Sequence, residues 1–156
     1  MTHVDIDDFE CPCDNKIGNA DLNIKNGIYT CGRCGKEHGK IQRPEEYKNE
    51  NLDCTVRALS KATGKKYSEV HDAWNKVGRK NRKRISAKNN VQKVCNILGV
   101  KAKQVKRSGN VNKFIKQNPE GNFFCLKRSH AFAINNGMIY DLSNTKSHLK
   151  GAWEIK

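Results

Sequence analysis

The stretch "NLDCTVRALSKATG", residues 51–64, combines a short amphipathic helix with a thiol at its first turn. Apolar residues recur at helical spacing after Cys54, and Gly64 supplies a helix stop. Cysteine is among the most buried residue types, so Cys54 taken alone is compatible with a core side chain. A nucleophile placed at a helix N-terminus is the alternative, and the residues that follow decide between the two.

Two further amphipathic helices are predicted over residues 67–78 and 86–99, and a shorter third helix follows them. Ser68 and Ser86 are suited to capping these two helices, and Gly78 and Gly99 end them. Trp74 and Cys95 lie on the apolar stripes and are expected in the core. His71 is expected to be a surface or capping group.

The pattern then changes from helical to strand periodicity. The apolar run "NFFCLK" (122–127) predicts a buried strand with its cysteine in the core, and "SHAFAINNGMIYDL" (129–142) predicts a hairpin around its Asn-Gly pair. A two-residue turn there places His130 and Asp141 on one sheet face as diagonal neighbours. A histidine and a carboxylate on an otherwise apolar face are costly to bury unless they pair.

This order of features is similar to that of papain-like cysteine peptidases, which have a cysteine at a helix start, a later histidine on a strand, and then an orienting group. The resemblance is to minimal members, such as bacteriocin-processing and NlpC-type peptidases. The segments "DCTVRALSKATGKKYSEV" and "SHAFAINNGMIYDLSN" also resemble short papain-like proteins encoded by phages. The resemblance covers about residues 50 to 145.

The resemblance implies a role for each matching residue. Cys54 would be the nucleophile, activated by the helix N-terminus and by an imidazolium. His130 would be the general base and Asp141 the group that orients it. An amide before the cysteine would complete the oxyanion hole, with Asn51 preferred to Asn49. The competing interpretation is a buried thiol and a hydrogen-bonded core histidine.

The N-terminal stretch "CPCDNKIGNADLNIKNGIYTCGRCG", residues 11–35, places two cysteine pairs on either side of a predicted hairpin. A hairpin would bring the pairs together, and four thiolates suit a tetrahedral Zn²⁺ ion. The segment resembles a zinc ribbon, although the first pair has one intervening residue where two are common. His38 could replace one ligand, and two disulfides or a catalytic metal are the alternatives. The predicted ligands of a structural zinc are Cys11, Cys13, Cys31 and Cys34.

Residues 40–50 contain a proline and little apolar content, so they are expected to be a linker. We therefore predict a zinc ribbon over 1–43 and a papain-like domain over 44–156. The predicted fold class is α+β, with helices packed on a small antiparallel sheet after the ribbon.

The charge of the chain is strongly asymmetric. The net charge is +14, yet residues 1–50 hold 7 Lys/Arg against 10 Asp/Glu, while residues 51–156 hold 23 against 6. Residues 61–116 form a basic stripe with 17 basic and 2 acidic residues. Such a field attracts nucleic acid or an acidic protein, with a solvated face as the alternative. The densest group, expected to contact nucleic acid, is Arg79, Lys80, Arg82, Lys83 and Arg84.

Together these features favour a cysteine hydrolase or acyltransferase acting on a peptide, isopeptide or amide bond. The zinc ribbon and the basic stripe would recruit it to its partner. The alternative is a non-catalytic, nucleic-acid- or polymerase-binding regulator on a papain-like scaffold. No apolar run is long enough to span a membrane, the start is acidic, and the seven cysteines are odd in number. We therefore expect a reduced, cytoplasmic protein without a membrane partner. A virus-encoded protein that acts in its host cell also fits this expectation.

Overall fold

The computed structural model of the chain describes residues 22–25, 28–31, 37–39, 41, 43–106, 109–142 and 148–156. In the first three of these ranges only the backbone is described. The predicted zinc ligands Cys11, Cys13 and Cys34 lie outside the described residues, and Cys31 is described only as a backbone position. The predicted zinc ribbon therefore stays a prediction.

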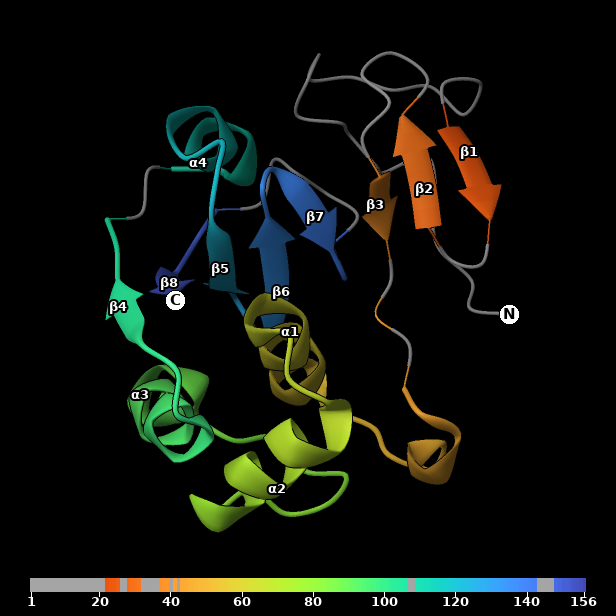
Figure 1. The fold of residues 1–156 in the computed structure, drawn as a ribbon, viewed down its shortest axis with the longest axis vertical. Helices are drawn as coiled ribbons and strands as arrows, with labels where there is room; N and C mark the ends of the chain where they lie inside the picture. Colours follow the sequence, from red (N-terminus) through yellow and green to blue (C-terminus); the bar gives the residue numbers. More distant parts are fainter. Residues whose placement is uncertain are drawn as a thin grey trace.

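A five-stranded antiparallel sheet with the order β7-β6-β5-β8-β4 forms the centre of the molecule (Figure 1). Three N-terminal strands extend it beyond β7, where β3 pairs with β7 in parallel through Gly39 and Tyr140. The strands are β1 (Leu22–Lys25), β2 (Ile28–Cys31), β3 (Glu37–Gly39), β4 (Ala102–Gln104), β5 (Asn122–Lys127), β6 (His130–Asn135), β7 (Met138–Tyr140) and β8 (Gly151–Ile155).

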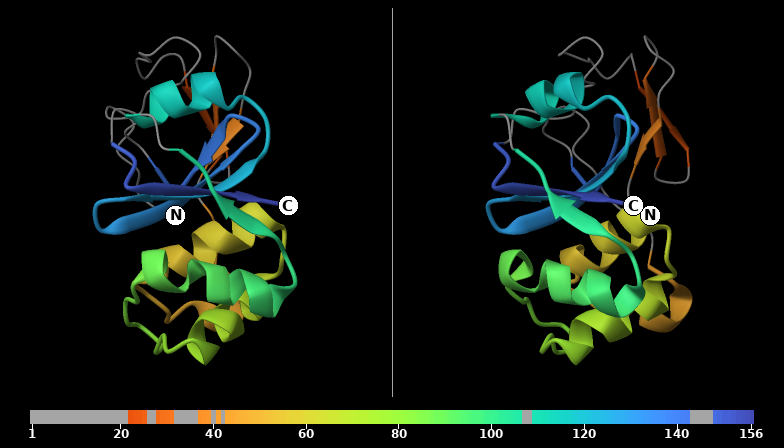
Figure 2. Two further views of the ribbon diagram at one scale, coloured as in Figure 1. Left: turned by 90° about the vertical axis from the view of Figure 1, so that its left-hand side faces the viewer. Right: turned by 60° about the vertical axis from the view of Figure 1, so that its left-hand side comes forward.

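Helices cover both faces of this sheet. Figure 2 shows α4 on one face and the other three helices on the opposite face. The helices are α1 (Cys54–Thr63), α2 (Tyr67–Lys76), α3 (Ala87–Leu98) and α4 (Val111–Gln117), and a short 3-10 helix, η3, spans Glu45–Tyr47. Four helices on an antiparallel sheet confirm the predicted α+β class. None of the helices in the described part of the chain is long and apolar enough to cross a membrane.

The two hydrophobic cores follow from the alternation of side chains along the strands. On β5, Phe123 faces α4, whereas Phe124 packs with α1, α2 and α3. On β6, Phe132 faces α4, whereas Ala131 and Ala133 face the other three helices. The two alanines are small, which lets the backbone of α1 lie close to β6, the strand it mainly packs against. The thiol at the first residue of α1 is thereby held near the start of β6.

The hairpin predicted from the Asn-Gly pair is confirmed with its register. Asn135 pairs with Met138 and Ile134 with Ile139, so the turn contains two residues. Asn136 and Gly137 both have positive φ angles, of 49° and 79°, as a type I′ turn requires. The turn sets which residues of β6 and β7 face each other, and hence places His130 beside the end of β7.

Several features were not anticipated from the sequence. Strands β4 and β8 were not predicted, and β8 lies between β5 and β4 inside the sheet. The expected linker contains η3 and ends at the buried Glu50. Trp74 and Cys95 are buried as predicted, but His71 is only 5% exposed, so its expected surface position was wrong.

Candidate functional site

A surface pocket of about 340 Å³ lies where four parts of the chain meet. Its walls come from Leu52 and the first turn of α1, from residues 84–88 at the start of α3, from residues 126–131 of the β5–β6 hairpin, and from Lys150 just before β8. Cys54 and His130, which are 76 positions apart in the sequence, both line it. The fold therefore brings the predicted nucleophile and the predicted base to one cavity.

Cys54 differs from the other described cysteines in its surroundings. It is the first residue of α1 and is partly exposed, whereas Cys95 and Cys125 are buried. Burial raises the pKa of the Cys95 thiol to about 11 and raises the pKa of the Cys125 thiol as well. Both buried thiols are core side chains, as predicted. The position of Cys54 in the first turn also places it at the helix end that attracts negative charge.

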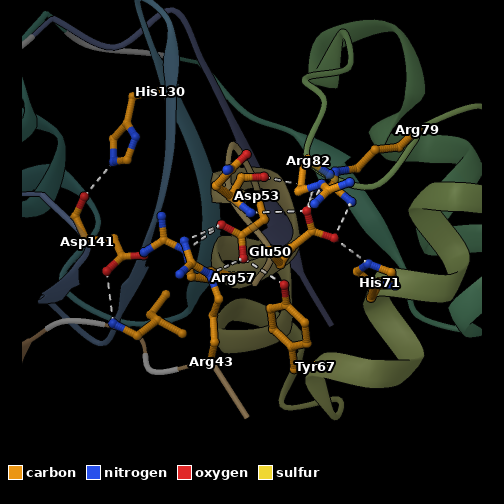
Figure 3. Close-up of polar contacts among 12 residues, drawn as sticks. Arg43, Glu50, Asp53, Arg57, Tyr67, His71, Arg79, Arg82, His130 and Asp141 are labelled. Carbon is orange, nitrogen blue, oxygen red and sulfur yellow. Dashed lines mark hydrogen bonds and ion pairs between the residues drawn. The ribbon is translucent and has the colours of Figure 1, made fainter. Parts of the chain in front are cut away.

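His130 is fixed by its neighbours in one orientation. Its Nε2 lies 2.6 Å from the backbone carbonyl oxygen of Asp141, and its ring stacks on Phe132 with centroids 6.4 Å apart (Figure 3 shows the polar contact). A carbonyl oxygen only accepts hydrogen bonds, so Nε2 carries the proton and Nδ1 keeps its lone pair. Burial lowers the pKa of this imidazole, although Asp141 opposes that effect. The neutral ring can therefore accept a proton at Nδ1.

The role expected of Asp141 is changed by the structure. The carbonyl oxygen, and not the carboxylate, accepts the hydrogen bond from His130. The carboxylate accepts instead from Arg57 Nη1 at 2.6 Å and from the backbone N–H of Ile41 at 2.9 Å. Asp141 has a positive φ of 66°, a backbone conformation that non-glycine residues adopt infrequently. This conformation directs the carbonyl and the carboxylate of one residue to two different partners.

Asn51 is not positioned as the oxyanion-hole residue that the sequence suggested. It is exposed, and it is not among the residues that line the pocket. Its backbone N–H donates to Glu50 and its carbonyl accepts from Arg79, so its backbone serves to hold the loop before α1. Asn49 lies at a different hollow, beside Tyr47. The pocket does contain the first turn of α1, whose leading N–H groups have no acceptor within the helix.

Asp53, the residue directly before Cys54, is the centre of a buried ion-pair cluster (Figure 3). Its side chain is fully buried and accepts from Arg43 at 2.9 and 3.0 Å, from Arg57 at 3.2 Å and from the Tyr67 hydroxyl at 2.6 Å. Burial opposes ionisation of this carboxyl, but the hydrogen bonds from Arg43 and Tyr67 outweigh it and lower the pKa to about 2. The charge next to Cys54 is thus neutralised by arginines.

Glu50 is a second buried carboxylate of the same loop. His71 Nε2 lies 2.7 Å from it, Arg79 Nη2 lies 3.1 Å from it, and the backbone N–H groups of Asn51 and Arg82 donate to it. Burial opposes ionisation here too, and the bonds from Arg79 and His71 prevail, lowering the pKa of Glu50 to about 2. The cluster of Glu50 and Asp53 with their partners, called the ion-pair cluster below, fixes the loop that leads into Cys54.

The basic group predicted to contact nucleic acid is divided by this arrangement. Arg79 is only 2% exposed and is committed to Glu50, so its guanidinium is not available to a phosphate. The other four residues of the group are exposed. Among them, Arg84 donates to the carbonyl of Ser129 at 2.8 Å and joins the loop before α3 to the β5–β6 turn. These remaining residues are Lys80, Arg82, Lys83 and Arg84.

The basic residues that give the pocket its charge were only partly anticipated from the sequence. Lys88, Lys127, Arg128 and Lys150 line it together with Arg84. Arg84 and Lys88 belong to the predicted basic stripe, whereas the other three lie outside it, and of these the adjacent pair at 127–128, just before His130, was a local signal. Among the described residues, no group of three or more His, Cys, Asp or Glu is arranged to hold a metal ion.

Comparisons with known proteins identified no relative. No family model matches the chain, and neither a curated protein nor a solved structure matches it.

Proposed function

We propose that the chain is a thiol-dependent hydrolase or acyltransferase of papain-like type, acting on a peptide, isopeptide or amide bond. The observation that carries this proposal is that Cys54, at a helix N-terminus, shares one pocket with His130. The bond from His130 Nε2 to the Asp141 carbonyl supports it, because that bond leaves Nδ1 as the basic nitrogen.

The chemistry would proceed in two halves. Nδ1 of His130 accepts the proton of the Cys54 thiol, and the sulfur attacks the carbonyl carbon of the substrate to give a tetrahedral intermediate. The C–N bond then breaks, the amine leaves with the proton from the imidazolium, and a thioester remains on Cys54. Water gives hydrolysis of this thioester, whereas a second amine gives acyl transfer. The leading N–H groups of α1 stabilise the oxyanion.

In the described part of the chain, no hydrogen bond joins Cys54 to His130. The His130 ring bonds to the backbone carbonyl of Asp141 instead. In substrate-free enzymes such contacts are often long and shorten in the substrate complex. A reducing, intracellular compartment would keep the thiol free, and we propose that location with the activity.

Alkylation by iodoacetamide at pH 7, read residue by residue by peptide mass spectrometry, tests the proposal. Cys54 should react at least about tenfold faster than Cys95 and Cys125, because they are buried thiols with raised pKa values. His130→Ala should slow Cys54 by about tenfold or more, whereas His148→Ala, at an exposed histidine, should not. Equal rates for Cys54 in the native chain and in the His130→Ala variant would contradict a base-activated nucleophile.

A second candidate is a nucleic-acid- or polymerase-binding regulator without catalysis. The exposure of Lys80, Arg82 and Lys83 on the loop between α2 and α3 favours it. Binding to DNA or RNA should then weaken steeply with salt, since each neutralised phosphate releases counterions. Replacing these three residues with Gln should flatten the salt slope, while Arg79 must be left in place because it is buried. No binding in a gel shift at low salt would leave an acidic protein as the partner.

We retain the proposal of a structural Zn²⁺ held by the N-terminal cysteines, which the described residues do not test. Four thiolate ligands would leave no open coordination position, so the metal would support folding and not catalysis. Elemental analysis should find one zinc per chain, and Cys31→Ser should release it. Reduced protein without stoichiometric metal would contradict the proposal.

A further inference from the structure

The pocket that contains Cys54 has a one-sided charge. Five basic side chains line it, and no carboxylate occurs among the described residues of its lining. All five belong to the part of the pocket outside α1, and Lys88, Arg128 and Lys150 are exposed. In the neighbouring loop before α1, by contrast, Arg79 and Arg43 are paired with the buried carboxylates of Glu50 and Asp53. The five are Arg84, Lys88, Lys127, Arg128 and Lys150.

These cations come from segments that are fixed relative to one another. Arg84 donates to the carbonyl of Ser129 at 2.8 Å, which ties the loop before α3 to the β5–β6 turn. The backbone N–H of Lys150 donates to Leu126 at 2.7 Å, which ties the segment before β8 to β5. The backbone segments that carry the five cations are therefore held together around one cavity.

The field of the two nearest helices has the same sign as that of the side chains. Both α1 and α3 begin in the wall of the pocket, at Cys54 and Ala87. The N-terminus of a helix favours a negative charge, so both helices add to the attraction of the lysines and arginines. A pocket with such walls concentrates anions near the sulfur.

We propose that the pocket binds an acyl donor that carries an anionic group, a carboxylate or a phosphate, within a few ångströms of the carbonyl attacked by Cys54. This inference rests on the proposed nucleophilic role of Cys54 and names the substrate class for it. The anionic group lies against Lys88 and Arg128, and the scissile carbonyl lies between the sulfur and the first turn of α1. A neutral or cationic acyl donor lacks this attraction and reacts more slowly.

Two alkylating reagents of nearly equal size test the charge of the pocket directly. Iodoacetate carries a carboxylate next to its reactive carbon and iodoacetamide carries a neutral amide, and in both the thiolate displaces iodide. The ratio of the two rates at Cys54, divided by the same ratio for Cys54 in the urea-unfolded chain, measures the preference for an anion. We expect this preference to be about 3- to 10-fold at low salt and to fall as salt is added.

Charge-neutralising variants distinguish the effect of the charges in the pocket from the effect of the net charge of the chain. Lys88→Gln with Arg128→Gln should remove most of the preference, because these side chains make no hydrogen bond or ion pair with the described residues and can be changed without loss of a structural contact. Lys116→Gln with Lys76→Gln removes the same charge at exposed positions that do not line the pocket, and should leave the preference unchanged. Thermal unfolding of both variants checks the fold.

The outcomes distinguish this inference from the proposed function. Fast reaction of Cys54 with iodoacetamide and no preference for iodoacetate overturns the anionic substrate but keeps the nucleophile. Slow reaction of Cys54 with iodoacetamide overturns its proposed role as a nucleophile, and with it the proposal of an anionic acyl donor. Protection of Cys54 from iodoacetamide by succinate but not by inorganic phosphate assigns the group to a carboxylate, and the reverse assigns it to a phosphate. Protection by neither, at concentrations up to tens of millimolar, also overturns the inference.

Discussion

The two charged regions on either side of Cys54 are built in opposite ways. In the ion-pair cluster, each carboxylate accepts several hydrogen bonds, and both Glu50 and Asp53 are buried. In the pocket, basic side chains stand together without a carboxylate among the described lining residues. Charges that are buried must be paired to be tolerated, whereas exposed charges such as those of Lys88 and Arg128 do not need a protein partner. The first region holds the loop before Cys54, and we propose that the second attracts the substrate of Cys54.

The cluster also has an electrostatic consequence for the thiol. A carboxylate one residue before Cys54 would oppose formation of a thiolate if it were unpaired. Arg43 and Arg57 both contact Asp53, and Arg57 also contacts Asp141, so the two arginines balance the charges of these two carboxylates. The pairing therefore serves the pocket as well as the fold.

Removal of the charge at Asp53 is expected to have the largest effect on this arrangement. Asp53→Asn keeps the size of the side chain but leaves two arginines and the Tyr67 hydroxyl with an incomplete set of acceptors. Breaking a buried ion pair on one side typically costs about 3–5 kcal/mol of unfolding free energy. Urea unfolding followed by circular dichroism measures the loss.

A matched control for this variant is Asp72→Asn. The side chain of Asp72 is 71% exposed and lies 3.7 Å from His71, so its loss should change stability by less than about 0.5 kcal/mol. Equal losses of unfolding free energy for the two variants would show that the ion-pair cluster stabilises the fold no more than an exposed pair does. The two charged regions would then not differ in this respect.

A smaller effect per group is expected on acidification. The pKa values of Glu50 and Asp53 are lowered to about 2 in the folded chain, below those of the unfolded chain. The stability that they contribute is therefore complete above their ordinary values and is lost as the pH falls from about 5 toward 2. Each carboxyl should account for about 2–3 kcal/mol of this loss.

Urea unfolding at pH 7, 5, 4 and 3 checks the acid dependence. Glu50→Gln should flatten the curve, because one of the two titrating groups is gone, although the variant is less stable at pH 7. Glu45→Gln, at a residue whose side chain is 85% exposed, should leave the shape of the curve unchanged. A wild-type curve that is flat down to pH 3 would mean that these carboxyls are not held as the structure shows them.

The parts of the fold that follow from local pattern could be predicted from the sequence. The helix at Cys54 is encoded by apolar spacing and by Gly64, which adopts the left-handed conformation at the helix end. The hairpin is encoded by two residues, Asn136 and Gly137, and its register follows from the turn. The placement of Cys54 and His130 at one pocket follows from these two elements once α1 packs on β6.

The parts that depend on distant partners could not be predicted in the same way. His71 and Arg79 lie 21 and 29 residues from Glu50, and no local pattern marks a histidine or an arginine that will be buried against a carboxylate. Strand β4 has three residues and gains its order only by pairing with β8. The hydrogen bond to a carbonyl of Asp141, in place of its carboxylate, depends on a backbone angle that the sequence does not encode.

The smallest effect is expected at Asp141, which belongs to both regions at once. Its carboxylate accepts from Arg57 in the ion-pair cluster, and its carbonyl holds His130 at the pocket. Asp141→Asn alters the first contact and preserves the second, because every residue has the same backbone carbonyl. We expect a loss of about 1–2 kcal/mol of stability from the weakened bond to Arg57. The rate of Cys54 alkylation by iodoacetamide should change by less than about threefold, against about tenfold or more for His130→Ala. If Asp141→Asn slows alkylation as much as His130→Ala does, the carboxylate, and not the carbonyl, orients the imidazole. A stability loss without that change in rate would show that one residue serves the two regions through two separate groups.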